Sequence, residues 1–300
     1  MDSPDAHLAQ VNIATLRAPM DHPATADFAA GLDPVNAAGE TAPGFVWRLA
    51  DDSGNATSIQ AFDDPLRIVN LTVWESVEAL RAFAYQGVHR DFFRRRAEWF
   101  DPAASATALW WIPAGTLPTV DDAIRRLRFA DVFGPSPYAF RMGQRQPRLV
   151  IAPAALDGPV TRSLIARLDA ELSAMYPEPG ANHFTLTAEQ VAGGGFLVAH
   201  LDDEPVGCGA FRMIAPGVAE LKRMFVDPSA RGAKLGAALV DALEAAAAGA
   251  GATRLVLETG IRQHAAAGLY ERLGFERIEP WGEYVASATT SVCMSKPCTA

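Results

Sequence analysis

The stretch from Val226 to Gly236 limits the possible fold and function of this chain more than any other stretch. It joins an apolar, strand-like run at residues 219–226 to an alanine- and leucine-rich segment at 235–248 that is typical of a helix. Asp227 and Pro228 end the strand, because proline supplies no N–H group to a ladder. A strand, a glycine-bearing turn and a helix aim free backbone N–H groups and the positive end of a helix dipole at one point. Such a point is a binding site for an anion, most often phosphate.

Two basic side chains in this turn, Arg231 and Lys234, favour a pyrophosphate as the anion. The spacing is neither Gly-x-x-x-x-Gly-Lys-Ser/Thr nor Gly-x-Gly-x-x-Gly, which excludes the two common nucleotide loops. It resembles the Arg/Gln-x-x-Gly-x-Gly/Ala signature of the GNAT N-acetyltransferases, in which the turn holds the pyrophosphate of acetyl-CoA. Arg231 and Gly236 match that signature, whereas Lys234 stands where its middle glycine is usual. By itself, the turn leaves an ordinary strand-to-helix connection open.

Length, charge and cysteine content limit which classes of protein this chain can belong to. The chain of 300 residues exceeds the usual ~100–200 residues of one domain, so we expect two domains. The formal net charge of −9 argues against nucleic acid or an anionic membrane as a partner. The N-terminus has no signal-peptide pattern, no apolar run reaches ~18 residues, and the three cysteines lack metal-binding spacing. We therefore expect a cytoplasmic protein without a metal.

The first half of the chain alternates strand and helix patterns. The expected strands cover residues 7–16, 44–49, 66–74 and 106–113, and the expected helices cover 24–39, 88–99, 120–130 and a segment that Ser76 caps. This β-α-β-β-α-β order with a further helix predicts a ferredoxin-like domain with an antiparallel sheet.

Three segments of this half carry a resemblance. Residues 44–48, 70–74 and 89–100 resemble a bacterial family of unknown function that is related to the dimeric α/β-barrel proteins, which include antibiotic-biosynthesis-type monooxygenases. The resemblance covers about residues 5–142, and we assign residues 1–143 to this first domain. It implies a ferredoxin-like α/β-barrel fold and a homodimer, but no reaction.

A pocket in the first half would be lined by one histidine, one arginine and several tryptophans. The candidates are His89, Arg90, Trp99, Trp47 and Trp74, because a histidine among tryptophans can bind a small aromatic or act as a base. The alternative, which we favour, is that the tryptophans belong to the core and that His89 lies on a helix surface.

The second half begins after a connector. Residues 134–147 hold three prolines and two glycines and break every periodicity. The strands expected beyond it cover 148–152, 195–201, 205–213, 219–226, 253–258 and 285–294, and the helices cover 159–175, 235–248 and 263–273. This element order resembles the GNAT fold with its mixed central sheet, over about residues 148–296. We assign 144–300 to a GNAT N-acetyltransferase domain, which makes the whole an α+β and α/β protein of two domains.

The resemblance implies roles for two residues in acetyl transfer. The acceptor amine must lose a proton, and the departing thiolate must be stabilised. Glu220, on the strand before the turn, stands where the family has its general base, although water alone serves some members. Tyr270, four residues before Gly274, matches the tyrosine that contacts the coenzyme sulfur. The alternatives are a surface salt bridge for Glu220 and a packed aromatic for Tyr270.

The resemblance also implies a set of acetyl-CoA contacts. This set consists of Met224, Phe225, Val226, Arg231, Gly232, Ala233, Lys234, Leu235, Gly236, Ala237 and Gln263. Gln263 stands where an asparagine is common in the family, so its side chain reaches farther than usual.

The acceptor pocket is expected from Tyr176, His183, Tyr284 and Glu258, with Trp281 beside them. Glu258 is a second acid–base candidate. An acidic cleft formed by Glu220 and Glu258 suits a cationic group, so we expect a primary amine of a small molecule as acceptor. Two alternatives stay open: a monooxygenase-like or ligand-sensing first half that carries the main function, and a second half that binds coenzyme without turnover.

Overall fold

The computed structural model describes residues 5–177 and 193–298. The chain divides into two compact units between Val150 and Ile151. One unit is built on a four-stranded sheet and the other on a seven-stranded sheet. Each unit has hydrophobic clusters of its own.

The sheet of the first unit has the strand order β2-β3-β1-β4, and all three of its strand pairs are antiparallel. Its strands are β1 (Ala6–Thr15), β2 (Phe45–Arg48), β3 (Arg67–Trp74) and β4 (Ala106–Pro113). Along β1, Ala9, Val11 and Ile13 point to one face and are buried there, as the period of two requires. The predicted antiparallel sheet is confirmed. A barrel would need strands beyond these four, so it stays a prediction.

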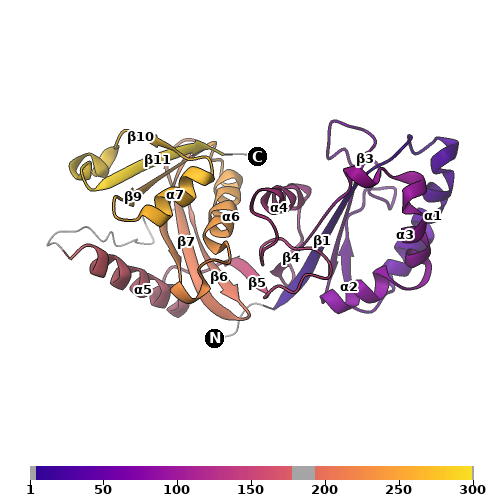
Figure 1. The fold of residues 1–300 in the computed structure, drawn as a ribbon, viewed down its shortest axis with the longest axis horizontal. Helices are drawn as coiled ribbons and strands as arrows, with labels where there is room; N and C mark the ends of the chain where they lie inside the picture. Colours follow the sequence, from indigo (N-terminus) through magenta and orange to yellow (C-terminus); the bar gives the residue numbers. More distant parts are fainter. Residues whose placement is uncertain (1–4, 178–192, 299–300) are drawn as a thin grey trace. The chain divides into compact units, whose positions relative to one another are not determined.

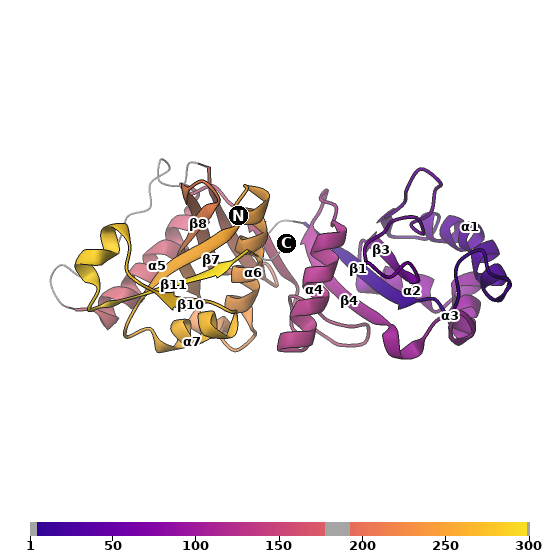
Figure 2. The same ribbon diagram turned by 90° about the horizontal axis from the view of Figure 1, so that it is seen from above.

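The helices of the first unit are α1 (Ala26–Glu40), α2 (Val77–Ala84), α3 (Gly87–Trp99) and α4 (Val120–Phe133), with short 3-10 turns η1 (Pro23–Thr25) and η2 (Pro102–Ala104). Ser76 caps α2 by accepting a hydrogen bond from the Ala79 amide at 3.1 Å. Thr119 and Asp122 form a capping box at the start of α4, which runs along β4 (Figure 2). The expected helix at 24–39 contains Pro34, and the structure shows one helix, α1, that includes this proline.

The sheet of the second unit has the order β10-β11-β9-β8-β7-β6-β5 and is mixed, because β8 and β9 are parallel while their neighbours pair antiparallel. Its strands are β5 (Leu149–Pro153), β6 (Gly195–Leu201), β7 (Glu204–Ala215), β8 (Val218–Val226), β9 (Arg254–Gly260), β10 (Glu276–Ile278) and β11 (Ser291–Pro297). Its helices are α5 (Pro159–Met175), α6 (Leu235–Gly249) and α7 (His264–Arg272), with the 3-10 segments η3 (Pro228–Ala230) and η4 (Gly282–Ser287).

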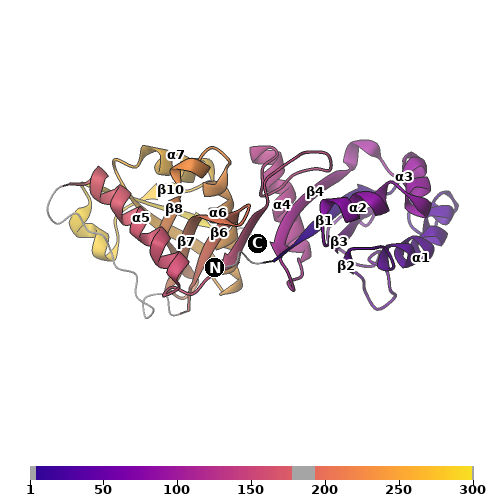
Figure 3. The same cartoon turned by 90° about the horizontal axis from the view of Figure 1, so that it is seen from below.

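Helices cover both faces of this second sheet. Helix α5 lies on one face, where Leu164 and Leu168 pack with Phe225 of β8 (Figure 3). Helices α6 and α7 lie on the other, where Leu243 and Tyr270 share a cluster with the sheet (Figure 1). Strand β8, in the middle of the sheet, is therefore covered by helices on both faces.

The expected strand at 285–294 is wrong at its start, and the short strand β10 was not expected. Strand β11 begins at Ser291, and the residues before it form η4. The reason is a tertiary contact: Tyr284 is drawn inward, where only 2% of its surface is exposed and its hydroxyl donates to Glu220. Val285, the next residue, then points outward with 62% of its surface exposed.

Candidate active site

Strands β8 and β9 separate in the middle of the sheet. Their parallel pairing runs from Val218 opposite Arg254 to Leu221 opposite Leu257, and stops there. Beyond Leu221, β8 continues to Val226 with β7 as its partner, while β9 continues with β11. The facing edges of the two strands thus present backbone N–H and C=O groups to a gap, and such groups require hydrogen-bond partners. An extended ligand that carries amide groups would satisfy these backbone groups.

A bulge marks the point where β8 leaves β9. Lys222 pairs with Ala210 and Phe225 with Cys208, so Arg223 and Met224 both stand opposite Gly209. Arg223 has a φ of 58°, a left-handed conformation that costs a non-glycine residue about 1–2 kcal/mol. Such strain is retained at ligand sites when the surrounding structure holds it.

The turn before α6 has the geometry of an anion site. Gly232 and Lys234 both adopt left-handed backbone conformations, with φ of 88° and 64°. The first-turn amides of Leu235, Gly236 and Ala237 find no acceptor in the described part of the chain, as expected for a helix N-terminus. The family's glycine at position 234 is explained by this left-handed conformation, which glycine adopts at little cost. A pyrophosphate fits these amides and the helix dipole behind them.

Arg231 does not present a free charge to this turn. Its Nη2 donates to both carboxylate oxygens of Glu171 on α5, at 2.8 and 2.6 Å, and its Nε donates to the Val226 carbonyl at 3.0 Å. We expected the guanidinium charge to face the bound anion, but it is balanced within the protein by Glu171. Of the other expected contacts, Phe225 is buried under α5. Gly236 lies so close to α7 that a Cβ atom would meet Leu269 at 2.9 Å.

Glu220 lies at the centre of an ionic cluster rather than on the surface, and its side chain has no exposed surface. Its Oε2 accepts from Arg212 Nε at 2.6 Å, and its Oε1 accepts from the Tyr284 hydroxyl. Lys222 Nζ donates to the Tyr284 oxygen at 2.7 Å and lies 3.6 Å from Glu220 Oε1. The alternative of a salt bridge at the surface is wrong in its location, because the partners Arg212 and Lys222 are themselves only 19% and 10% exposed.

A second carboxylate joins this cluster from η4. Oε1 of Glu283 accepts from Arg212 Nη2 at 3.0 Å and from Lys222 Nζ at 3.4 Å. Two cations, Arg212 and Lys222, are thus shared between two carboxylates, Glu220 and Glu283. Arg212 and Lys222 thus lie against the charge of Glu220, while Glu258, the other carboxylate of the expected acidic cleft, lies close enough for the charges of Glu220 and Lys222 to act on it. The acidic cleft stays a prediction. Sequence reasoning missed Arg212 and Glu283, although the register of the β7–β8 hairpin places Arg212 directly opposite Glu220.

Tyr270 and Glu258 lie near each other beside the gap. Burial raises the pKa of Tyr270, and the nearby Glu258 carboxylate raises it further, so the phenol keeps its proton. No hydrogen bond from this hydroxyl to a described residue is found, which leaves it able to donate to a ligand. Burial also raises the pKa of Glu258, against a hydrogen bond from Ser291 and the charge of Lys222, which lower it. A carboxylate with a raised pKa is a stronger base.

The remaining expected residues have structural contacts. The Tyr176 hydroxyl accepts from the Arg262 amide at 3.0 Å and lies over Gly260, where a Cβ atom would be only 2.1 Å from it. Gln263 Oε1 accepts from Thr259 at 2.9 Å. Trp281 stacks edge-on against Tyr284. His183 lies outside the described residues.

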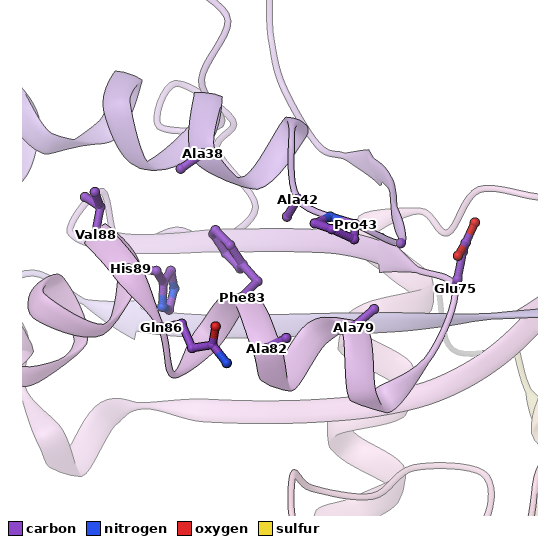
Figure 4. Close-up of a pocket in the computed structure, with 12 residues that line it drawn as sticks. Ala38, Ala42, Pro43, Glu75, Ala79, Ala82, Phe83, Gln86, Val88 and His89 are labelled. Carbon is purple, nitrogen blue, oxygen red and sulfur yellow. The ribbon is translucent and has the colours of Figure 1, made fainter.

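The first unit has a hollow of about 600 Å³ between the end of α1, α2 and the start of α3 (Figure 4). Of the five candidates in this half, His89 alone lines it, while Trp74 and Trp99 are buried and Arg90 is exposed. His89 Nδ1 lies 3.0 Å from the Ala84 carbonyl, and burial lowers the pKa of its imidazole. The structure therefore does not bring these five side chains together.

Comparisons with known proteins agree with this division. Residues 163–275 match the profile of the acetyltransferase (GNAT) family, and residues 7–152 match a domain of unknown function, DUF3291. A protein of Azospirillum brasilense named IAA acetyltransferase is 39% identical over 139 residues, which cover 45% of this chain and 88% of that protein. The chain belongs to the GNAT acetyltransferase family. It is therefore an acyltransferase, and acetyl-CoA is its acetyl donor.

Two solved structures are similar to the GNAT half. One is a Klebsiella pneumoniae subsp. pneumoniae MGH 78578 protein assigned to the acyl-CoA N-acyltransferases, 34% identical, covering 50% of this chain and 98% of that chain with a TM-score of 0.43. The other is an acetyltransferase from Streptococcus agalactiae 2603, 23% identical, covering 50% and 98% with a TM-score of 0.41. In the described ranges, no cluster of histidine, cysteine, aspartate or glutamate is arranged to hold a metal ion. No helix in those ranges is long and apolar enough to cross a membrane.

Proposed function

We propose that the GNAT half transfers the acetyl group of acetyl-CoA to a primary amine of a small molecule. The observation that carries this proposal is the gap between β8 and β9, which ends at the amide-lined turn before α6. The turn would hold the pyrophosphate, and the open edge of β8 at Met224 and Val226 would hold the amide groups of the coenzyme arm. Bound acetyl-CoA supplies an activated acetyl thioester.

Tyr270 is the proposed donor to the departing thiolate. Its phenol keeps its proton because of burial, and its hydroxyl has no competing acceptor among the described residues. It also belongs to α7, which packs on the same face of the sheet as α6 and its turn. A neutral phenol that donates to sulfur stabilises the thiolate without a charge of its own.

Two carboxylates, Glu220 and Glu258, are candidates to remove the proton of the amine, and their contacts favour Glu258. Both oxygens of Glu220 already accept hydrogen bonds, and its side chain has no exposed surface. Removal of a proton by Glu220 would require Arg212 or Tyr284 to move. Glu258 is partly exposed and has a raised pKa. We therefore assign proton removal to Glu258, and to Glu220 the positioning of Arg212 and Tyr284.

The test is release of free coenzyme A from acetyl-CoA with a panel of amines, together with the mass of the acetylated product. Once an acceptor is found, pH–rate profiles of Glu258→Gln and Glu220→Gln separate the two carboxylates. Loss of the base should lower the rate most at low pH, where the amine is protonated, by about 10²-fold or more. If Glu258→Gln keeps the parent profile while Glu220→Gln loses it, Glu220 is the base. If no amine is acetylated, the proposed function fails.

A further inference from the structure

We infer that the acceptor carries a carboxylate beside its amine, and that this carboxylate takes the place of Glu283 between Arg212 and Lys222. This inference rests on the proposed function and names the class of its acceptor: amino acids and similar compounds that hold both groups. It comes from the ionic cluster around Glu220, which the proposed chemistry does not otherwise use.

The cluster holds two poorly solvated cations, which favour carboxylates beside them. Arg212 and Lys222 are 19% and 10% exposed; Glu220 supplies one negative charge beside them, and Glu258 lies within reach of the Lys222 charge. A poorly solvated cation without a partner is costly, so anions beside these two cations are favoured. Glu283 fills that place in this structure, which shows that a carboxylate fits between Arg212 Nη2 and Lys222 Nζ.

Glu283 is held far more weakly than Glu220. Both of its contacts go through the same oxygen, Oε1, and the contact with Lys222 is 3.4 Å long. Its side chain is 40% exposed, and it comes from the short 3-10 segment η4 rather than from the sheet. Because Glu283 itself is exposed, water can solvate its carboxylate when it leaves, and an incoming carboxylate would replace its contacts with Arg212 and Lys222, so a ligand can replace it at little net cost.

The position of the cluster ties it to the proposed reaction. Lys222 is the first residue of β8 after the last pair with β9, so its side chain begins where the gap opens. Glu258 is the first residue of β9 beyond the same pair, and the Lys222 charge acts on it. A carboxylate held by Lys222 and Arg212 would therefore place the neighbouring amine toward Glu258 and the gap.

Pairs of amines that differ only in a carboxylate test this inference directly. The probes are phenylalanine and phenethylamine, tryptophan and tryptamine, and lysine and cadaverine, so that no carbon skeleton is assumed. Their affinity for the full chain is measured by calorimetry with coenzyme A present, which prevents turnover. In at least one pair we expect the member with the carboxylate to bind about 10- to 100-fold more tightly, the range of a charge-assisted hydrogen bond.

Two variants assign that preference to the cluster. Lys222→Gln should abolish the preference, whereas Glu283→Gln should strengthen binding of the carboxylate member by about 2- to 5-fold, because the competing anion is gone. Glu279→Gln makes the same charge change at an exposed site nearby and should alter nothing. Thermal unfolding of each variant checks that it is folded. If Lys222→Gln does not fold, Glu283→Gln, which changes an exposed side chain, still tests the inference.

Each contrary result has a distinct meaning. The inference is wrong if no pair favours the carboxylate member, if neither member of any pair binds, or if Glu283→Gln weakens binding of the carboxylate member. Failure of the proposed function is separate, because it appears as loss of coenzyme A binding by the parent or as acetylation of no amine at all.

Discussion

Arg212 Nε lies 2.6 Å from Glu220 Oε2, and the two residues stand opposite each other in the β7–β8 pair. The carboxylate has no exposed surface, and the Tyr284 hydroxyl donates to its other oxygen. Glu220 therefore holds one residue of β7 and one residue of η4 in place at the edge of the gap. Glu220 thus has a structural role as well as an electrostatic one. A residue that acted only as a general base would not need these structural contacts.

Glu220→Gln should destabilise the second unit. The change leaves the Arg212 and Lys222 charges with one anion fewer in a poorly solvated place, so we expect a loss of about 2–4 kcal/mol in the free energy of unfolding. Urea unfolding measures it. Glu271→Gln, which breaks an exposed pair with Arg277, is the matched control and should cost less than about 1 kcal/mol. Equal losses in the two variants would contradict the buried cluster.

Glu258→Gln should change stability in a way that depends on pH. Burial raises the folded-state pKa of Glu258 above its unfolded value, so the folded protein disfavours the ionised form. This cost is absent below the unfolded pKa, grows as pH rises, and is complete above the folded pKa. Glu258→Gln should therefore raise the melting temperature at pH 8 relative to the parent, and by less at pH 4. A shift that is the same at both pH values would show that the carboxyl does not titrate differently on folding.

Tyr270→Phe should keep the ring and its contact with Phe275 but remove the hydroxyl. We expect kcat to fall by about 10- to 100-fold, the lower part of the range for general acids, with acetyl-CoA affinity little altered. Steady-state kinetics and calorimetry of the variant check the two parts. If coenzyme binding is lost while kcat is kept, Tyr270 serves packing and not the leaving group.

A fragment of residues 145–300 should fold and bind acetyl-CoA. It keeps β5, which begins at Leu149 and forms the edge of the seven-stranded sheet, and it contains both clusters that cover this sheet. Circular dichroism and calorimetry test the fragment. An unfolded fragment would mean that the second unit depends on the first for its core.

The sequence predicted most elements because their signals are local. The bounds of β4 and α5 agree with the prediction, since Pro113 ends one and Pro159 begins the other. The anion turn was predictable because glycine, proline and basic residues fall at fixed spacing.

The ionic cluster was only partly predictable, because Arg212 faces Glu220 across a hairpin, whereas Tyr284 and Glu283 reach the cluster from far along the chain. The partners of Glu220 come from β7 and from η4, 64 residues away along the chain at Tyr284. The same contact draws Tyr284 inward, so that β11 begins only at Ser291. The sequence does not show this contact, and residues 285–294, which include several apolar and β-branched residues, were therefore predicted to form one strand. The balance of Arg231 by Glu171 of α5 is another contact of this kind, at 60 residues of separation.

Binding of acetyl-CoA at the turn before α6 is the central claim, and calorimetry of one variant tests it most directly. Ala233→Asp places a carboxylate beside the first-turn amides, where it would occupy the anion site and repel a pyrophosphate without disturbing the helix, since acidic groups stabilise this end. Ala250→Asp makes the same change at the exposed far end of α6 and is the control. We expect Ala233→Asp to weaken acetyl-CoA binding by at least about tenfold, or 1.4 kcal/mol, and Ala250→Asp to leave it unchanged. Parental affinity in a folded Ala233→Asp variant would contradict the site.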